Sequence, residues 1–166
     1  MYVTLPAVEI GAHLDTASPV DAFVAAFAGA WRAPSGPDAF ADHLEQWFAT
    51  DVRLIQPQMP PIVGVDAFRE DFVRPLFALM PDLHGIVEGW AASGDVIYID
   101  LRLEGTVGRR RVTMRSVDRI TLRDGRMIER VANLDPTPLV TAVLLSPSAW
   151  LRFARTQLRA LRRRRT

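Results

Sequence analysis

Apolar residues change their spacing near residue 80, and this change predicts the architecture of the chain. In segments 19–32, 37–48 and 67–80 they recur every three or four residues, which indicates amphipathic helices. A short apolar run at 51–57 ends at a proline and indicates one strand. Beyond residue 84 the period becomes two, with turn signals between four successive strands. This order predicts an α+β fold, with helices packed on one face of an antiparallel sheet.

Capping residues mark the expected helix boundaries. Ser18 before Pro19 is the usual order at a helix start. Asp66 is the expected N-cap of the third helix, and Pro75 should kink that helix. We interpret the aromatic faces of the first two helices as core, with pocket lining as the alternative; these faces consist of Phe23, Phe27, Trp31, Phe40, Leu44 and Phe48.

The strand alternation decides which charges point inward. In segment 96–104 the apolar face consists of Ile97, Ile99, Leu101 and Leu103. We expect this face to contact the helices, whereas Asp100 and Arg102 lie on the polar face. In the next strand the apolar set contains two polar residues, Ser116 and Asp118. Both are therefore predicted to face the core.

The register of the last hairpin depends on the turn around Asp124 and Gly125. A two-residue loop would place Arg119 opposite Arg130, which opposes like charges. A three-residue loop places Asp118 opposite Arg130 and Arg119 opposite Glu129, and this register is the prediction. An inward ion pair is costly to desolvate. It therefore indicates either the polar floor of a pocket or a structural bridge in an incompletely filled core.

Composition limits the chemistry and the partners. The chain has 166 residues, 49% of them hydrophobic, and no cysteine, so disulfides, thiolate zinc sites and cysteine nucleophiles are excluded. No leader peptide or transmembrane segment is predicted, which favours a cytoplasmic protein. All 20 basic residues are arginine, and seven of them lie at 152–165. Removing these seven leaves 13 arginines against 19 acidic residues, so the body is not expected to bind nucleic acid.

The predicted domain organisation follows from these patterns. Residues 1–17 form an N-terminal arm, 18–145 a single α+β domain, and 146–166 a basic amphipathic C-terminal helix. We expect the apolar side of this helix to dock on the acidic body. Contact with an anionic surface is the alternative.

Several segments, taken in order, resemble the SnoaL-like branch of the nuclear transport factor 2-like superfamily. They are "AFAGAW", "FATDVRLIQP", "PPIVGVDAFREDFV", "MPDL" and "VDRITLRDGRMIERVANLDP". The resemblance implies a cone-shaped barrel, in which a curved antiparallel sheet wraps around three helices and encloses an apolar pocket. It also implies a homodimer, and the interface expected on the outer sheet face comprises Tyr98, Arg102, Arg115, Val117 and Arg119.

Two enzyme types of the superfamily can be compared residue by residue. In SnoaL-like polyketide cyclases an aspartate on the strand before the "DG" turn accepts a proton, and Asp118 matches it. The histidine that accompanies it has no match, because His13, His43 and His84 all lie outside this strand pair. The chain also resembles limonene-epoxide hydrolase, with Gln56 at its water-holding amide. The catalytic Asp-Arg-Asp set of that enzyme would correspond here to three apolar residues, Leu101, Leu103 and Ala132.

The predicted site combines these residues. Asp118 would be the base and Arg130 would stabilise an oxyanion. The expected substrate contacts are Gln56, Ser116, Leu54, Leu101, Leu103, Phe27 and Trp31; the direction of His84 stays open, and no cofactor or metal is implied. The predicted function is proton transfer on an apolar polyketide- or steroid-like substrate, of the cyclase or isomerase type. The alternative is a non-catalytic binding module for a small apolar ligand.

Overall fold

The computed structural model describes residues 18–56 and 59–146. The predicted arm, 1–17, and residues 147–166 of the predicted basic helix lie outside the described residues. The division into arm, domain and tail therefore stays a prediction. No helix among the described residues is long and apolar enough to cross a membrane.

Three helical segments lie in the first half of the chain, as the spacing predicts. Helix α1 spans Pro19–Arg32 and α2 spans Pro37–Glu45. The third segment is continuous and comprises α3 (Val65–Ala67), the π-helical η1 (Phe68–Val73) and α4 (Arg74–Leu79). Helix α1 begins with a capping box, in which the Ser18 hydroxyl accepts from the Asp21 amide and the Asp21 carboxylate accepts from the Ser18 amide.

The third helical segment differs from the expected simple helix. It starts at Val65 after Gly64, so Asp66 lies in its first turn and is not the N-cap. The expected kink at Pro75 takes the form of a π-helical stretch directly before it: the Arg74 amide donates to Arg69 O, five residues back. A wider turn accommodates the proline ring, which would collide with the preceding turn of a regular α-helix.

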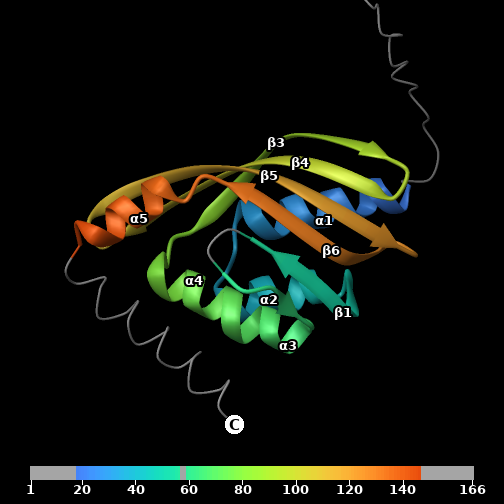
Figure 1. Cartoon of the computed structure of the whole chain (residues 1–166), viewed down its shortest axis with the longest axis horizontal. Coiled ribbons are helices and arrows are strands. Elements are labelled where there is room, and N and C mark those ends of the chain that lie inside the picture. Colours follow the sequence, from blue (N-terminus) through green and yellow to red (C-terminus); the bar gives the residue numbers. More distant parts are fainter. Residues whose placement is uncertain (1–17, 57–58, 147–166) are drawn as a thin grey trace, which may run out of the picture.

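The sheet has six strands in the order β2-β1-β6-β5-β4-β3. The strands are β1 (Phe48–Ile55), β2 (Ile62–Val63), β3 (His84–Ser93), β4 (Val96–Val107), β5 (Arg110–Arg123) and β6 (Arg126–Leu134). The sheet is curved and unclosed, and its long strands arch over the helices (Figure 1). One pairing corrects the antiparallel expectation, because β1 runs parallel to β6.

The alternation in β4 and β5 is confirmed. The inner face of the sheet is buried and consists of Ile97, Ile99, Leu101, Leu103, Val112, Met114, Ser116, Asp118, Ile120 and Leu122. The aromatic faces of α1 and α2 pack against it as part of one hydrophobic core. Tyr98 and Arg102 lie on the opposite face.

The predicted hairpin register is wrong, although the predicted faces are right. The turn has two residues, Asp124 and Gly125, both with positive φ (52° and 73°), which is the conformation of a type I′ turn. Thr121 on β5 pairs with Glu129 on β6, but the next residue, Leu122, pairs with Met127, so a β-bulge places one extra residue on β6. The bulge shifts the pairing beyond it by one residue. As a result Asp118 lies opposite Ala132, and Ile120 lies opposite Arg130. The bulge restores the parity, so Asp118 and Arg130 still share the inner face as diagonal neighbours.

Three further expectations are corrected. Helix α2 ends at Glu45, so Phe48 is the first residue of β1 and not part of a helical face. The loop before the third helix contains the short strand β2, which pairs with β1. Residues Thr137–Leu144 form α5, a helix inside the region expected to end the domain.

Candidate functional site

A buried ion pair occupies the inner face of β5 and β6. Asp118 is 0% exposed and Arg130 is 5% exposed. One carboxylate oxygen, Oδ2, accepts from Arg130 Nε at 2.7 Å and lies 2.6 Å from Nη2. The other, Oδ1, accepts from the Ser116 hydroxyl at 2.5 Å. The carboxylate is thus held on both sides, which compensates part of the cost of burying its charge.

Aromatic rings from two helices face the guanidinium. Arg130 Cζ lies 6.0 Å from the ring centroid of Phe27 on α1 and 5.8 Å from that of Phe72 on η1. Both distances fall in the range of cation–π attraction. Leu54 on β1 is the register partner of Arg130 on β6. The guanidinium therefore lies between the sheet and two aromatic rings, in apolar surroundings.

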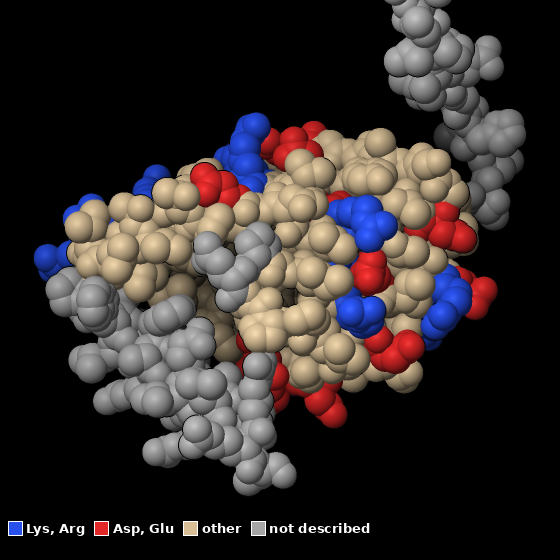
Figure 2. Space-filling model, viewed as in Figure 1, with Lys and Arg blue, Asp and Glu red and all other residues tan. Residues whose placement is uncertain are grey.

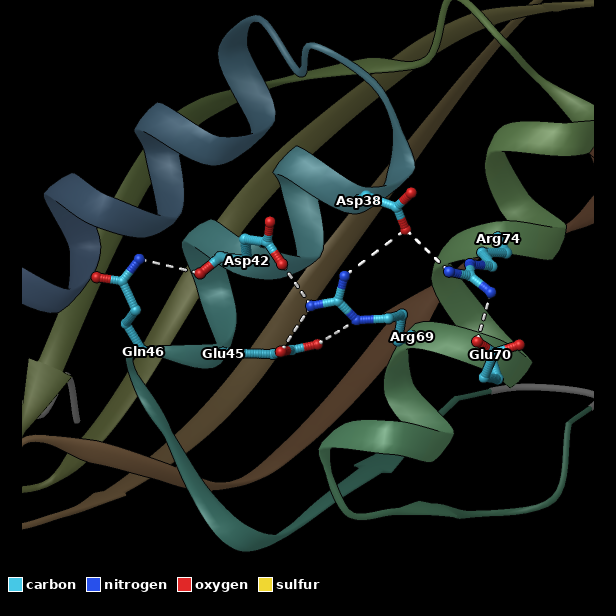
Figure 3. Close-up of polar contacts among 7 residues, drawn as sticks. All are labelled: Asp38, Asp42, Glu45, Gln46, Arg69, Glu70 and Arg74. Carbon is cyan, nitrogen blue, oxygen red and sulfur yellow. Dashed lines mark hydrogen bonds and ion pairs between the residues drawn. The ribbon is translucent and has the colours of Figure 1, made fainter.

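A surface network fixes the π-helical segment that carries Phe72. Arg69 on η1 forms ion pairs with three acids of α2, at 3.6 Å to Asp38, 2.5 Å to Asp42 and 2.8 Å to Glu45. Figure 3 shows Arg69 pointing from its helix to the acidic side of α2, with Arg74 contacting Asp38 beside it. The network ties η1 to α2 and so helps to position Phe72 over the ion pair.

Trp31 and its neighbours form the other part of the predicted lining. A Cβ on Gly85 would lie 3.1 Å from Trp31 Cβ, 3.0 Å from a methyl of Leu103 and 3.2 Å from one of Leu101. A larger residue at this position would therefore press on α1 and β4 at their present distance. The indole ring also packs against Phe27, with centroids 6.3 Å apart. The structure thus brings Trp31, Leu101 and Leu103 together.

The predicted polar partners divide into two groups. Ser116, Asp118 and Arg130 meet as expected. Gln56 lies just after β1, and its amide contacts Met59 Sδ at 2.9 Å near the surface, which favours a loop-fixing role over the pocket position we expected. His84 is half-buried on the outer face, with Nε2 3.7 Å from Glu104, so its direction is away from the core.

Phe72 and Gly85 are the two residues that sequence reasoning missed. Phe72 follows Phe68 at helical spacing. This spacing predicts that Phe72 lies in the core, but it does not predict its contact with Arg130. Gly85 gave no signal, because its role depends on the approach of α1 to the sheet. No group of three or more His, Asp or Glu residues within 18–56 and 59–146 is placed to hold a metal ion.

The outer face of the sheet carries the residues of the predicted interface. Tyr98 and Val117 are diagonal neighbours, each 47% exposed. Around them Arg102 and Arg115 both pair with Glu88, at 2.7 and 2.8 Å. On the side of the molecule seen in Figure 2, basic and acidic side chains likewise lie next to one another. Charges at the centre of this outer face are thus arranged as opposite pairs.

Comparisons with known proteins agree with this architecture. A candidate SnoaL-like polyketide cyclase from Jannaschia sp. CCS1 is 23% identical, with a TM-score of 0.66 over 81% of this chain and 100% of that one. A nuclear transport factor 2-like protein of unknown function from Burkholderia pseudomallei K96243 is 16% identical, with a TM-score of 0.67 over 76% and 98%. TerC, co-crystallised with polyporic acid, is 16% identical, with a TM-score of 0.66 over 76% and 98%. At these identities the likeness concerns the fold.

No curated protein matches the sequence at a significant level. A family model does match, the SnoaL-like domain, over residues 20–130. The match begins in α1 and ends at Arg130 in β6, so it includes both members of the buried ion pair. The chain therefore belongs to the SnoaL-like domain family.

Proposed function

We propose that the protein binds a small, largely apolar, oxygen-bearing molecule of polyketide or steroid type between α1, η1 and the inner sheet face. Arg130 would be the polar contact, and Asp118 with Ser116 would hold its guanidinium in place. The observation that carries the proposal is the ion pair itself. A buried pair is often no better for stability than apolar residues of the same volume, so its retention needs another reason.

The geometry of Arg130 favours ligand contact. Its Nε donates a hydrogen bond to Asp118 Oδ2, and its Nη2 forms an ion pair with the same oxygen. Within the described part of the chain, Nη1 makes no hydrogen bond, so its two N–H groups can donate to an oxygen of the ligand. The rings of Phe27 and Phe72 beside it would contact the apolar body of such a molecule.

The test uses a double variant, because a single one leaves a buried charge without its partner. Asp118→Leu combined with Arg130→Met keeps the core apolar and should fold. The probe is polyporic acid, which was co-crystallised with the structurally similar TerC. We expect binding to the wild type by calorimetry and a loss of at least tenfold in the double variant. Equal affinity in both proteins, or no binding to the wild type, would overturn the proposal.

Proton transfer by Asp118 is the second candidate. A resemblance and one observation favour it: Asp118 resembles the acid of SnoaL-like polyketide cyclases, and among the described residues its Oδ1 accepts only from the Ser116 hydroxyl, which can rotate away. Oδ1 could then take a proton next to a substrate carbonyl, while Arg130 stabilises the oxyanion. This function predicts protein-catalysed exchange of the α-hydrogens of 2-tetralone in D₂O, lost in Asp118→Asn. An unchanged exchange rate in that variant would exclude Asp118 as the base.

We also propose that the protein is a homodimer joined through the outer sheet face. Tyr98 and Val117 form its apolar centre, and Arg102, Arg115 and Arg119 surround them. Light scattering should give twice the chain mass at micromolar concentration. Val117→Asp should produce a folded monomer, because it places a charge in the centre of the contact, whereas Arg109→Gln in the exposed β4–β5 turn should leave the dimer intact. A monomeric wild type would remove this claim.

A further inference from the structure

The indole N–H of Trp31 is a buried donor that the protein's own groups do not satisfy. Trp31 is 1% exposed, and its Nε1 makes no hydrogen bond to any part of the chain that the structure describes. It is the single buried side-chain polar atom of this kind among the described residues. Such a group carries the full desolvation penalty of an unmade hydrogen bond. Phenylalanine would fill most of the same space without that penalty, so the N–H needs its own explanation.

The position of Trp31 connects it to the proposed ligand site. Its ring centroid lies 6.3 Å from that of Phe27, and the same Phe27 ring lies 6.0 Å from Arg130 Cζ. On its other side the indole packs edge-on against Phe40, with centroids 4.7 Å apart. Gly85 allows this placement, because any larger residue would press on Trp31 Cβ. Trp31 and Arg130, the two residues that carry donors with spare capacity, thus both lie beside the Phe27 ring.

We propose that the Trp31 indole N–H is a second hydrogen-bond donor for the ligand and determines specificity. This inference rests on the proposed function of the Arg130 site. The ligand would be a ring-based molecule with two separated acceptor oxygens, one for Arg130 and one for Trp31. A quinone or a polyoxygenated aromatic has this form. A hydrocarbon, or a molecule with a single oxygen, would leave the N–H without a partner in the complex, and the site would discriminate against it.

Nitrogen-15 spectra report on this hydrogen bond directly. The chain has four tryptophans, so the indole region contains at most four N–H signals, and Trp31→Phe identifies the one from Trp31. In the free wild type this signal should have the upfield proton shift of an indole without a hydrogen bond. Adding polyporic acid should move it downfield, whereas naphthalene, which has no oxygen, should not.

Affinity provides the second measurement. Trp31→Phe should bind polyporic acid about three- to tenfold more weakly than the wild type, the usual effect of one hydrogen bond between neutral groups. Naphthalene should bind both proteins equally. The matched control is Trp47→Phe: Trp47 also packs on an aromatic residue of α1, with its ring centroid 6.3 Å from that of Phe23, but it is only partly buried and its N–H is not among the fully buried donors that lack a partner. Its affinity for polyporic acid should equal that of the wild type.

The outcomes separate this inference from the proposed function. If the double variant at Asp118 and Arg130 loses affinity for polyporic acid but Trp31→Phe does not, the inference fails and the proposed function stands. A free-state signal already at a hydrogen-bonded shift would also overturn it, since a buried water would then satisfy the indole. If the wild type does not bind polyporic acid, the proposed function fails and this inference fails with it.

Discussion

Two groups of charged residues in this protein lie in opposite surroundings. Asp118 and Arg130 form one pair inside the core, under the rings of Phe27 and Phe72. Arg69 instead forms a network with Asp38, Asp42 and Glu45 on the outside of α2 and η1 (Figure 3). The contact distances overlap, at 2.6 Å for the buried pair and 2.5 to 3.6 Å for the network. The difference is in access to water.

Water decides what each arrangement contributes. At the surface, solvent screens the charges and can replace a lost partner, so the individual pairs are weak. Hydrogen bonds to Glu45, and to a smaller extent to Asp42, raise the pKa of the Arg69 guanidinium. Arginine is charged near neutral pH even without such partners, so this shift does not change its charge. In the core, neither Asp118 nor Arg130 can exchange its partner for water. Removing either residue of the buried pair therefore leaves the other charge without a partner, whereas the surface network can lose one ion pair at little cost in stability.

The largest predicted effect comes from breaking the buried pair. Arg130→Met leaves the Asp118 charge buried without its main partner and should lower the free energy of unfolding by about 3–5 kcal/mol. Asp118→Leu should have a similar effect by leaving the guanidinium unpaired. The double variant should recover most of the loss. Urea unfolding of all three proteins measures this, and a double variant less stable than both single ones would contradict the desolvation argument.

The core around the site should also resist small additions, which gives a second and smaller effect. Gly85→Ala brings a methyl group to 3.0–3.2 Å from Leu103, Trp31 and Leu101. We expect a loss of about 1–3 kcal/mol, the usual cost of overpacking. Gly89→Ala on the same strand is the matched control, because a Cβ there has no atom within 4 Å. Thermal unfolding of both variants compares them; equal stability would show that α1 can move away from the sheet without cost.

The contrast between core and surface also explains how far the sequence could predict the structure. The alternation in β4 and β5 predicted the inner face, including Ser116 and Asp118, because burial of one sheet face imposes a period of two. The pairing across the last hairpin was wrong, because a β-bulge adds a residue that no local pattern announces. The parallel pairing of β1 with β6 joins distant segments, and so does the approach of Trp31 to Gly85. Both depend on tertiary packing and not on local sequence.

A third prediction concerns the surface network. Arg69→Gln removes the cation that α2 shares with η1, and we expect a loss of about 1 kcal/mol or less because two of its three partners are mostly exposed. Raising the salt concentration should shrink the difference from the wild type, since screening weakens surface charge interactions. Arg109→Gln, in the exposed turn between β4 and β5, should have no measurable effect. A loss as large as that of Arg130→Met would remove the distinction between the two regions.

The smallest predicted effect is a dependence on pH at an exposed acid. Asp82 accepts hydrogen bonds from the Thr106 amide and hydroxyl, both at 2.7 Å, and the hydroxyl is the main cause that lowers the pKa of Asp82 below 3.8. Because the pKa of Asp82 is lower in the folded state than in the unfolded state, the ionised carboxylate stabilises the fold at pH values above the unfolded-state pKa. This stabilisation is lost as the pH falls through the folded-state pKa. Thr106→Val should raise the pKa of Asp82 toward 3.8 and make the loss of stability below pH 4 slightly shallower, whereas Thr106→Ser should preserve both. Carbon-13 titration of the Asp82 carboxyl measures the pKa directly, and an unchanged value in Thr106→Val would show that the Thr106 hydroxyl does not cause the shift.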